Sequence, residues 1–235
     1  MKTILITLFL LLSAFAFSSE TLTIATFHIP LMVESKDEGV FIELTEALAK
    51  EAGLELTIIV LPPQRALQEL AAQKVDGVFP GLKVLMVGSY ERSELIYVKR
   101  DYVFTFKGNP PLETIEELSG KHVGVTSGYP YVKKLTSNES INLDVANSDN
   151  QNVKKLTSGR IDAFVVEERS GLKAFVDNGS QDEIFYNPSQ PLSEQDVFYA
   201  FQKNIRGKVL ADKISAALLV LKQNGTFERI MAKAQ

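Results

Sequence analysis

Few side chains in this chain have the types and spacing that catalysis or metal binding requires. Its 235 residues include no cysteine and only two histidines, His28 and His122, which lie far apart in the sequence. There is no His-x-x-His or His-Glu-x-x-His metal spacing and no Gly-x-Ser-x-Gly nucleophile turn. From the sequence, neither histidine is expected to act as a general base with an orienting partner. The sequence therefore favours ligand binding over catalysis, with no cofactor and no metal.

Glu167 is the acid whose position best suits a binding site. It follows the short apolar run Ala163 to Val166, five residues after Asp162. A carboxylate at the carboxyl end of a parallel strand points into the crevice where open α/β sheets bind their ligands. Glu167 also adjoins Glu168 and Arg169, so a surface salt bridge is the alternative interpretation. As a cleft acid it could also do acid-base work.

An internal repeat marks the elements that would position such a group. The segment Leu70 to Phe79 (LAAQKVDGVF) returns 86 positions later as Leu156 to Val165 (LTSGRIDAFV). In each copy apolar residues at helical spacing lead to a basic residue, a β-branched residue, an Asp and a short apolar run. This order is typical of a helix followed by a buried strand in a parallel sheet. Two such units predict two similar α/β lobes with a cleft between them, and clefts bind small ligands.

The composition is that of an ordinary globular protein. Hydrophobic residues make up 45% of the chain and charged residues 23%, which argues against disorder. The formal net charge is −4, and no basic run is longer than a pair. A nucleic-acid partner is therefore not expected.

The first 18 residues are interpreted as a signal peptide. Lys2 supplies a positive charge, Ile4 to Phe17 is apolar but too short to span a membrane, and small residues surround Ala16. We expect cleavage near Ser18 and a periplasmic location, with an uncleaved anchor as the alternative. Without cysteine, the mature chain has neither a disulfide nor a thiol for lipid attachment.

Strands and helices are expected to alternate in two sets, interrupted at Gly108–Pro111 and at Pro188–Pro191. Two breaks imply two crossings between the lobes and hence a double hinge. We expect lobe 1 to comprise Ser19 to Thr105 with Val197 to Gln235, and lobe 2 to comprise Phe106 to Asp196. Besides the repeated units, the pattern predicts strands at Leu22–Thr26, Glu55–Val60, Val75–Pro80, His122–Thr126, Ile141–Val145 and Val197–Gln202, helices at Glu43–Glu51, Arg65–Gln73, Leu112–Leu118, Tyr131–Leu135, Val209–Gln223 and Phe227–Lys233, and a strand-and-helix step around Leu95–Phe106.

Several segments, in this order and spacing, resemble one protein family: Gly39–Leu44, Ala47–Gly53, Val75-Asp76, Ser89–Arg92, Gly159–Ala163 and Leu218–Ile230. Over essentially the whole mature chain the sequence is similar to the family 3 bacterial extracellular solute-binding proteins. The resemblance implies an α/β, type II periplasmic-binding fold, in which two lobes of mostly parallel sheet flanked by helices are joined by two hinge strands. It also implies that the lobes close over a small ligand, usually a polar amino acid.

The resemblance further implies specific ligand contacts. Arg92 matches the arginine of the family's Thr-x-x-Arg motif, which binds the ligand carboxylate, and Ser89 stands in place of the Thr. A guanidinium offers a carboxylate two parallel charge-assisted hydrogen bonds. Glu167 matches the acid that receives the ligand's ammonium. The alternative for Arg92 is a solvated loop position, since an insertion at Pro80 to Gly88 precedes it.

Two further segments depart from the family pattern. Gly128 permits close backbone approach, but Pro130 lacks an N–H that family members offer there, and Tyr129 adds bulk and a hydroxyl. Pro130 also fits the first position of a helix, without any ligand. Ligand contacts are predicted for Gly128 and Tyr129.

The second departure concerns the two aromatic walls that often hold the ligand's side chain. The first falls at Phe27-His28, whereas the second falls near Pro63-Gln64-Arg65, where no aromatic stands. His28 is a candidate ligand contact or a packed loop residue. Arg65 either faces the cleft or is exposed on its helix.

The predicted function is capture of a small polar, carboxylate-bearing ligand for an ABC transporter. The alternatives are a sensory binding module that reports to a membrane receptor and a periplasmic lyase or dehydratase on the same fold. The expected partners are the small-molecule ligand and an inner-membrane permease or sensor receptor, with the protein itself a monomer.

Overall fold

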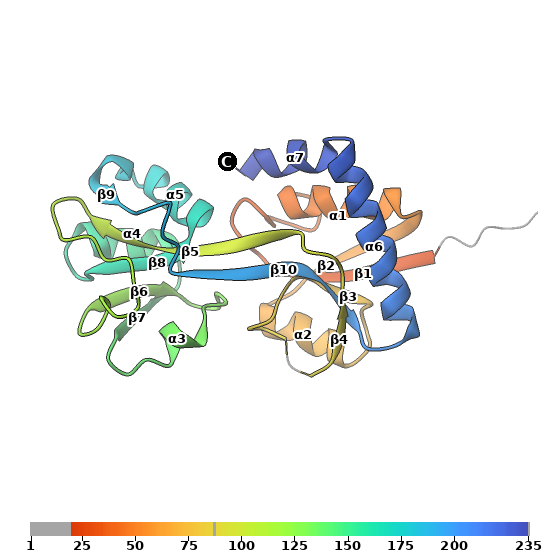
Figure 1. Ribbon diagram of the computed structural model, residues 1–235, viewed down its shortest axis with the longest axis horizontal. Coiled ribbons are helices and arrows are strands. Elements are labelled where there is room, and N and C mark those ends of the chain that lie inside the picture. The colour runs from red at the N-terminus through yellow and green to blue at the C-terminus, as the bar shows by residue number, and fades with distance from the viewer. Residues whose placement is uncertain (1–19, 87, 235) are drawn as a thin grey trace, which may run out of the picture.

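The computed structural model describes residues 20–86 and 88–234 and shows an α/β protein of two lobes (Figure 1). The predicted signal peptide, residues 1–18, lies outside the described residues. The strands are β1 (Glu20–Thr26), β2 (Leu54–Val60), β3 (Gly77–Leu82), β4 (Tyr90–Arg92), β5 (Tyr97–Phe106), β6 (His122–Thr126), β7 (Asn142–Ala146), β8 (Ala163–Glu167), β9 (Ile184–Phe185) and β10 (Ser193–Gln202). The α-helices are α1 (Val40–Glu51), α2 (Pro63–Ala71), α3 (Lys133–Thr136), α4 (Asp149–Thr157), α5 (Glu168–Asp177), α6 (Ile205–Gln223) and α7 (Thr226–Met231).

One sheet passes through both lobes in the order β2-β1-β3-β10-β5-β8-β6-β7. Lobe 1 contains β1 to β4, α1, α2, α6 and α7, and lobe 2 contains β6 to β9 and α3 to α5. In each lobe three strands run parallel: β1, β2 and β3 in lobe 1, and β6, β7 and β8 in lobe 2. Within the described part of the chain, no helix combines the length and the apolarity needed to cross a membrane.

The sheet of lobe 1 is covered on both faces. Successive side chains of β1 point to opposite faces of the sheet. Leu22 and Ile24 pack with α1 and α6 on one face, and Ala25 packs with α2 on the other. The helix α1 can begin where it does because Gly39 has a φ of +131° and no side chain. A Cβ there would lie 2.3 Å from the carbonyl oxygen of Met32, so only glycine fits this turn.

Lobe 2 repeats this plan around β8. Phe164 and Val166 pack with α4 and α5 on one face, and Ala163 and Val165 pack with Val123 and its neighbours on the other. All four of these β8 residues are fully buried. This is why the sequence of β8 is a continuous apolar run and shows no alternation.

The repeated aspartates have the same structural role in both lobes. Asp76 precedes β3 and accepts a hydrogen bond from the backbone N–H of Thr23 at 2.8 Å. Asp162 precedes β8 and accepts one from the N–H of His122, also at 2.8 Å. Each aspartate therefore ties the start of its strand to the neighbouring parallel strand, β1 or β6.

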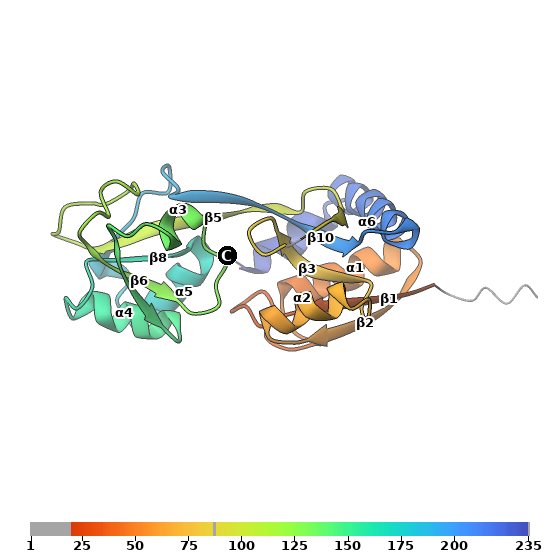
Figure 2. The same cartoon turned by 90° about the horizontal axis from the view of Figure 1, so that it is seen from below.

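Two antiparallel strands, β5 and β10, connect the lobes (Figures 1 and 2). On β5, Tyr97 packs against the core of lobe 1 and Tyr102 belongs to that of lobe 2. On β10, Val197 belongs to the lobe 1 core. We propose that the chain crosses between lobes at 98–101 and 193–196, close to the predicted boundaries after Thr105 and before Val197.

Two sequence predictions of helix were wrong. The segment Leu95–Phe106 contains strand β5 and no helix, because pairing with β10 and β8 on its two sides fixes β5 as extended. Leu112–Leu118 forms turns: the Glu117 side chain accepts hydrogen bonds from the N–H groups of Glu113 (2.8 Å) and Thr114 (3.0 Å). These local bonds replace the start of a helix. The helix α5, by contrast, was not predicted.

Candidate functional site

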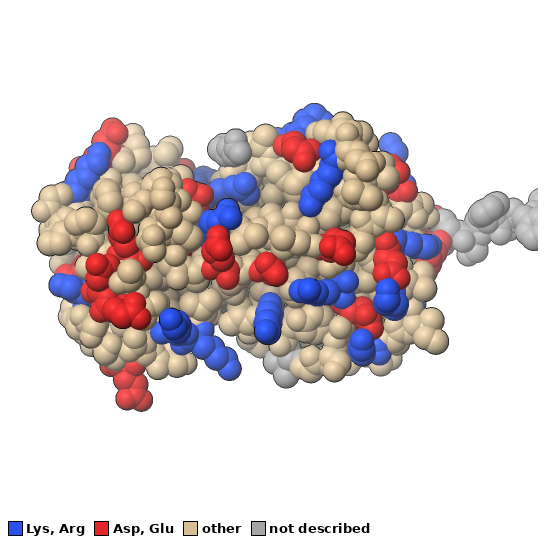
Figure 3. All heavy atoms as spheres, viewed as in Figure 1, with Lys and Arg blue, Asp and Glu red and all other residues tan. Residues whose placement is uncertain are grey.

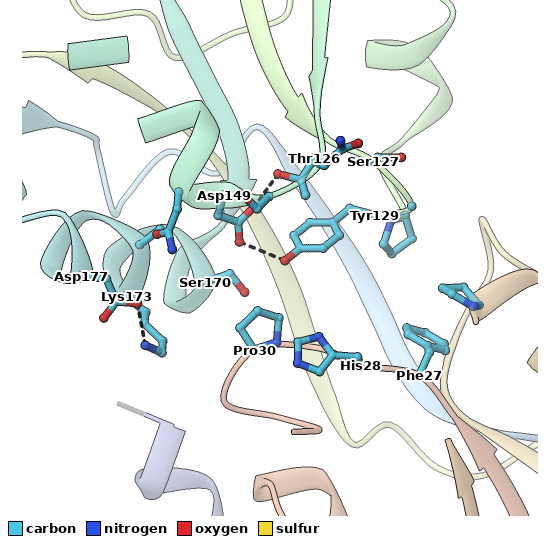
Figure 4. A pocket seen from close by; sticks show the side chains of 17 residues that line it. Phe27, His28, Pro30, Thr126, Ser127, Tyr129, Asp149, Ser170, Lys173 and Asp177 are labelled. Carbon is cyan, nitrogen blue, oxygen red and sulfur yellow. Dashed lines mark hydrogen bonds and ion pairs between the residues drawn. The ribbon is translucent and has the colours of Figure 1, made fainter. Parts of the chain in front are cut away.

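A cleft with a volume of about 340 Å³, here called the outer chamber, lies between the two lobes (Figure 4). That volume is within the range of small-molecule sites. Lobe 1 contributes Phe27, His28, Pro30 and Pro63, and lobe 2 contributes residues 126–130, 147–150, 170, 173, 174 and 177. Figure 3 shows one face of the molecule, with the waist between the lobes and with acidic and basic side chains interspersed on each lobe.

The outer chamber lies where the parallel strands end. Phe27 and His28 follow β1, Ser127 follows β6 and Asn147 follows β7. Because parallel strands direct their carboxyl ends to one edge, the loops after them gather there. These edges of the two lobes face each other, so loops from both lobes line the cleft.

A narrow inner recess of about 40 Å³ adjoins the outer chamber. Both are lined by Phe27, Tyr129, Pro130 and Ser170. The inner recess adds apolar residues of β3 and three polar side chains, which are Tyr97, Lys99 and Glu167. It therefore lies beside the strands that connect the lobes.

Glu167 lines the inner recess and also begins α5. Its carboxylate accepts a hydrogen bond from the backbone N–H of Ser170 at 3.0 Å, which caps the helix. Burial raises the pKa of Glu167, and the Ser170 hydrogen bond and the cations Arg169 and Lys99 oppose that rise. The predicted ligand contact at Glu167 thus lies in the cleft, but it also has a structural role.

The cations beside Glu167 are Lys99 and Arg169. Lys99 is buried and forms an ion pair with Asp101, which also accepts a hydrogen bond from the Ser193 hydroxyl at 2.8 Å. The Arg169 guanidinium lies over the ring of Tyr97, 5.9 Å from its centre. Lys99 and Glu167 line the inner recess, and with their neighbours Asp101 and Arg169 the two cations balance the two acids.

Tyr129 stands between the two cavities. Its hydroxyl donates to Asp149 at 2.9 Å, and Asp149 also accepts a hydrogen bond from the hydroxyl of Thr126. Burial and the charge of Asp149 raise the pKa of Tyr129 far above its usual range, with a smaller contribution from Glu167. Tyr129 is therefore a neutral hydrogen-bond donor, and its acceptor is Asp149.

Two more predicted contacts line the outer chamber. Gly128 has a φ of +80°, and nothing lies within 4 Å of the position of a Cβ. Glycine is therefore favoured here by backbone conformation more than by crowding.

His28 is exposed, and its Nε2 lies 3.3 Å from a carboxylate oxygen of Glu34. Within residues 20–86 and 88–234, no cluster of three metal-ligating side chains occurs.

Arg92, Ser89 and Arg65 do not line either cavity. Arg92 is on β4, which pairs with β10 at Ala200, and its guanidinium lies 5.6 Å from the ring centre of Phe198. Ser89 borders a separate hollow beside α2. Arg65 is largely exposed and pairs with Glu69 one turn along α2. The structure does not bring these three residues to Glu167, so their ligand roles stay predictions without support from the geometry.

Three residues of the site were not predicted from the sequence: Asp149, Lys99 and Arg169. Asp149 follows Ser148, the N-cap residue of α4. Such a pair indicates in a sequence that a helix begins there, but it does not show that the helix start lies in the cleft. Lys99 lies in a segment that was predicted as a strand-and-helix step. Arg169 was considered only as a partner of Glu167, and a sequence cannot show which aromatic ring a side chain covers.

Comparison with known proteins decides the family. The chain matches the family model for bacterial extracellular solute-binding proteins, family 3, over residues 23–234. It belongs to that family. This confirms the resemblance seen in the sequence and makes the chain a solute-binding protein by family.

Two of the similar proteins are named for the basic amino acids that they bind. The arginine-binding extracellular protein ArtP of Bacillus subtilis (strain 168) is 26% identical over 203 residues, which cover 83% of this chain and 76% of that protein. The lysine/arginine/ornithine-binding periplasmic protein of Escherichia coli (strain K12) is 25% identical over 235 residues, with coverages of 94% and 90%.

Solved structures confirm the fold. The GluR0 ligand-binding core from Nostoc punctiforme, in complex with (L)-glutamate, has a TM-score of 0.73 at 22% identity and covers 90% of this chain and 98% of its own. An ancestral arginine-binding protein bound to arginine has a TM-score of 0.69 at 23% identity, with coverages of 91% and 97%. At such identities the likeness speaks for the two-lobed architecture alone.

Proposed function

We propose that this protein captures a small polar ligand, an amino acid or a related carboxylate, between its lobes and delivers it to an inner-membrane ABC transporter. The observation that carries the proposal is that the outer chamber has walls from both lobes, including Phe27 and His28 from one and Tyr129 from the other. A ligand that contacts both walls stabilises the closed arrangement. Binding then shifts the hinge equilibrium by the difference in affinity between the closed and open states.

The inner recess suits the backbone of a zwitterionic amino acid. Glu167 would receive the α-ammonium, and the α-carboxylate would lie near Lys99 and Arg169, the cations that already act on Glu167. Phe27 and Tyr129 would enclose the ligand where recess and chamber meet. This arrangement replaces the predicted role of Arg92, which lies on the edge of lobe 1.

Export through the cytoplasmic membrane is part of the proposal. Residues 1–18 would be removed as a signal peptide, which leaves a mature chain that begins close to β1. Support comes from Glu20, whose carboxylate pairs with Arg206 (3.0 Å) and with Lys213 of α6. These pairs fix the first strand just after the predicted cleavage site near Ser18.

A thermal-shift screen tests the proposal. A ligand at about one hundred times its dissociation constant adds roughly 2.7 kcal/mol of stability, which for a chain of this size raises the melting temperature by about 5 to 10 °C. We expect such shifts with one or more of the twenty common amino acids. Shifts with sugars or metal ions alone would refute the proposal, and chemical conversion of a hit, followed by chromatography, would indicate an enzyme instead.

A further inference from the structure

We infer that Asp149 binds a cationic group on the side chain of the ligand, so that the ligand of this protein is a basic amino acid. The inference rests on the proposed function and assigns a specificity residue within the same cleft. It is carried by the burial of Asp149, by its hydrogen-bond partners and by the charge balance of the cleft.

Asp149 is buried in the wall of the outer chamber. Only 7% of its surface is exposed, and Figure 4 shows its carboxylate beside the hydroxyls of Thr126 and Tyr129 at the edge of the cavity. It is the first residue of α4, after the N-cap Ser148. The positive end of the helix therefore stabilises its charge in part.

The partners of Asp149 are neutral. Tyr129 and Thr126 donate hydroxyl hydrogen bonds to its two oxygens, and the amide of Asn152 donates to the Thr126 hydroxyl at 3.1 Å. This chain of donors fixes the direction of the carboxylate. Burial still raises the pKa of Asp149, against the effect of both hydroxyls.

No cation pairs with Asp149 among residues 20–86 and 88–234. Two other acids around the cleft form ion pairs: Asp177 pairs with Lys173 at 2.7 Å, and Asp101 pairs with Lys99. The third, Glu167, has the cations Arg169 and Lys99 near enough to lower its pKa. A buried carboxylate without a counter-ion is costly, because burial removes its hydration. A cation supplied by the ligand would remove that cost in the bound state.

The charge balance of the cleft leads to the same ligand class. The charged groups that line or adjoin the two cavities are Lys99, Arg169, Lys173, Asp101, Asp149, Glu167 and Asp177. Among these described groups the sum is −1, and the uncompensated charge is that of Asp149. A zwitterion leaves this charge in place, whereas an amino acid with a cationic side chain neutralises it.

The geometry allows one ligand to reach both acids. Glu167 lines the inner recess, Asp149 lines the outer chamber, and Tyr129 lines both cavities. The α-ammonium can meet Glu167 while an aliphatic stem passes the rings of Phe27 and Tyr129. The charged end of the stem then lies at Asp149.

Arginine and citrulline provide the test, because they have nearly the same shape and differ by one charge. Calorimetric titration of the wild-type protein should give arginine at least about tenfold tighter binding than citrulline, as expected for a hydrogen bond to a buried charge. In Asp149→Asn this ratio should fall to within about threefold. The matched control is Asp144→Asn, which removes a carboxylate of lobe 2 that is already paired with Lys155 and lines neither cavity, and it should keep the wild-type ratio.

The ratio does not depend on the fraction of folded protein, so a less stable variant remains informative. Equal binding of arginine and citrulline by the wild type, or an unchanged ratio in Asp149→Asn, would overturn the inference while neutral amino acids could still bind. If none of the twenty amino acids and neither probe binds, the proposed function fails together with the inference.

Discussion

Replacing Glu167 with Gln should abolish tight ligand binding without unfolding the protein. The structure gives this side chain two separable tasks, since its carboxylate caps α5 through the Ser170 N–H and also lines the inner recess. A glutamine retains an oxygen that can accept the Ser170 hydrogen bond, so helix α5 should persist. What it removes is the negative charge proposed to receive the ligand's α-ammonium.

The size of the effect follows from burial. Truncating one partner of a buried, hydrogen-bonded charge pair costs about 2 to 5 kcal/mol of binding, which corresponds to a loss of roughly 30-fold or more in affinity. Calorimetric titration with a ligand from the screen measures this loss, and circular dichroism checks the fold. A Glu167→Gln variant that binds within about threefold of the wild type would refute the assignment.

The pH dependence gives a second readout of the same residue. Burial raises the pKa of Glu167 in the folded protein, so the folded state without ligand favours the neutral acid. Its contribution to stability is therefore present below the unfolded pKa and is lost as the pH rises through the folded pKa. Ligand affinity changes in the opposite direction, because the α-ammonium needs the charged form.

We expect wild-type affinity to fall on acidification, starting at a higher pH than for an ordinary glutamate, whose pKa is about 4.3. The pKa of Asp149 is also raised, so Glu167→Gln should keep only the part of this decline that Asp149 causes. Wild-type affinity that is constant from neutral pH down to the onset of acid unfolding would contradict the reasoning.

Two further predictions concern residues outside the cleft. Arg92→Ala should change ligand affinity by less than about threefold, since Arg92 lies on the edge of lobe 1; a loss of about 30-fold in calorimetry would instead restore the predicted carboxylate contact. Asp162→Ala and Asp76→Ala should each lower the free energy of unfolding by about 1 to 3 kcal/mol in urea titrations, because each removes a charged acceptor from a backbone N–H. Asp76→Ala should cost more, since Asp76 also pairs with Arg206 at 2.8 Å; equal costs would show that this pair contributes nothing.

Elements with a local signal could be predicted from the amino-acid sequence alone. The strand predicted at His122–Thr126 is β6 with the same bounds, and the two copies of the repeat became equivalent junctions before β3 and β8. These predictions succeeded because apolar periodicity and helix-end residues act over a few positions. The position of Glu167 in the cleft followed from the same logic, since a strand end fixes where the next side chain lies.

Which distant residues share the cleft depends on how the chain folds and could not be predicted from local patterns. Arg92 carries a family motif, but β4 pairs with β10 and holds it on the edge of lobe 1. Asp149 carries no motif, yet the start of α4 meets the loop after β6 and brings it beside Tyr129. Strand pairing, burial and counter-ions depend on contacts between residues far apart in the sequence. For that reason the charge balance that points to a basic ligand could be read only from the folded chain.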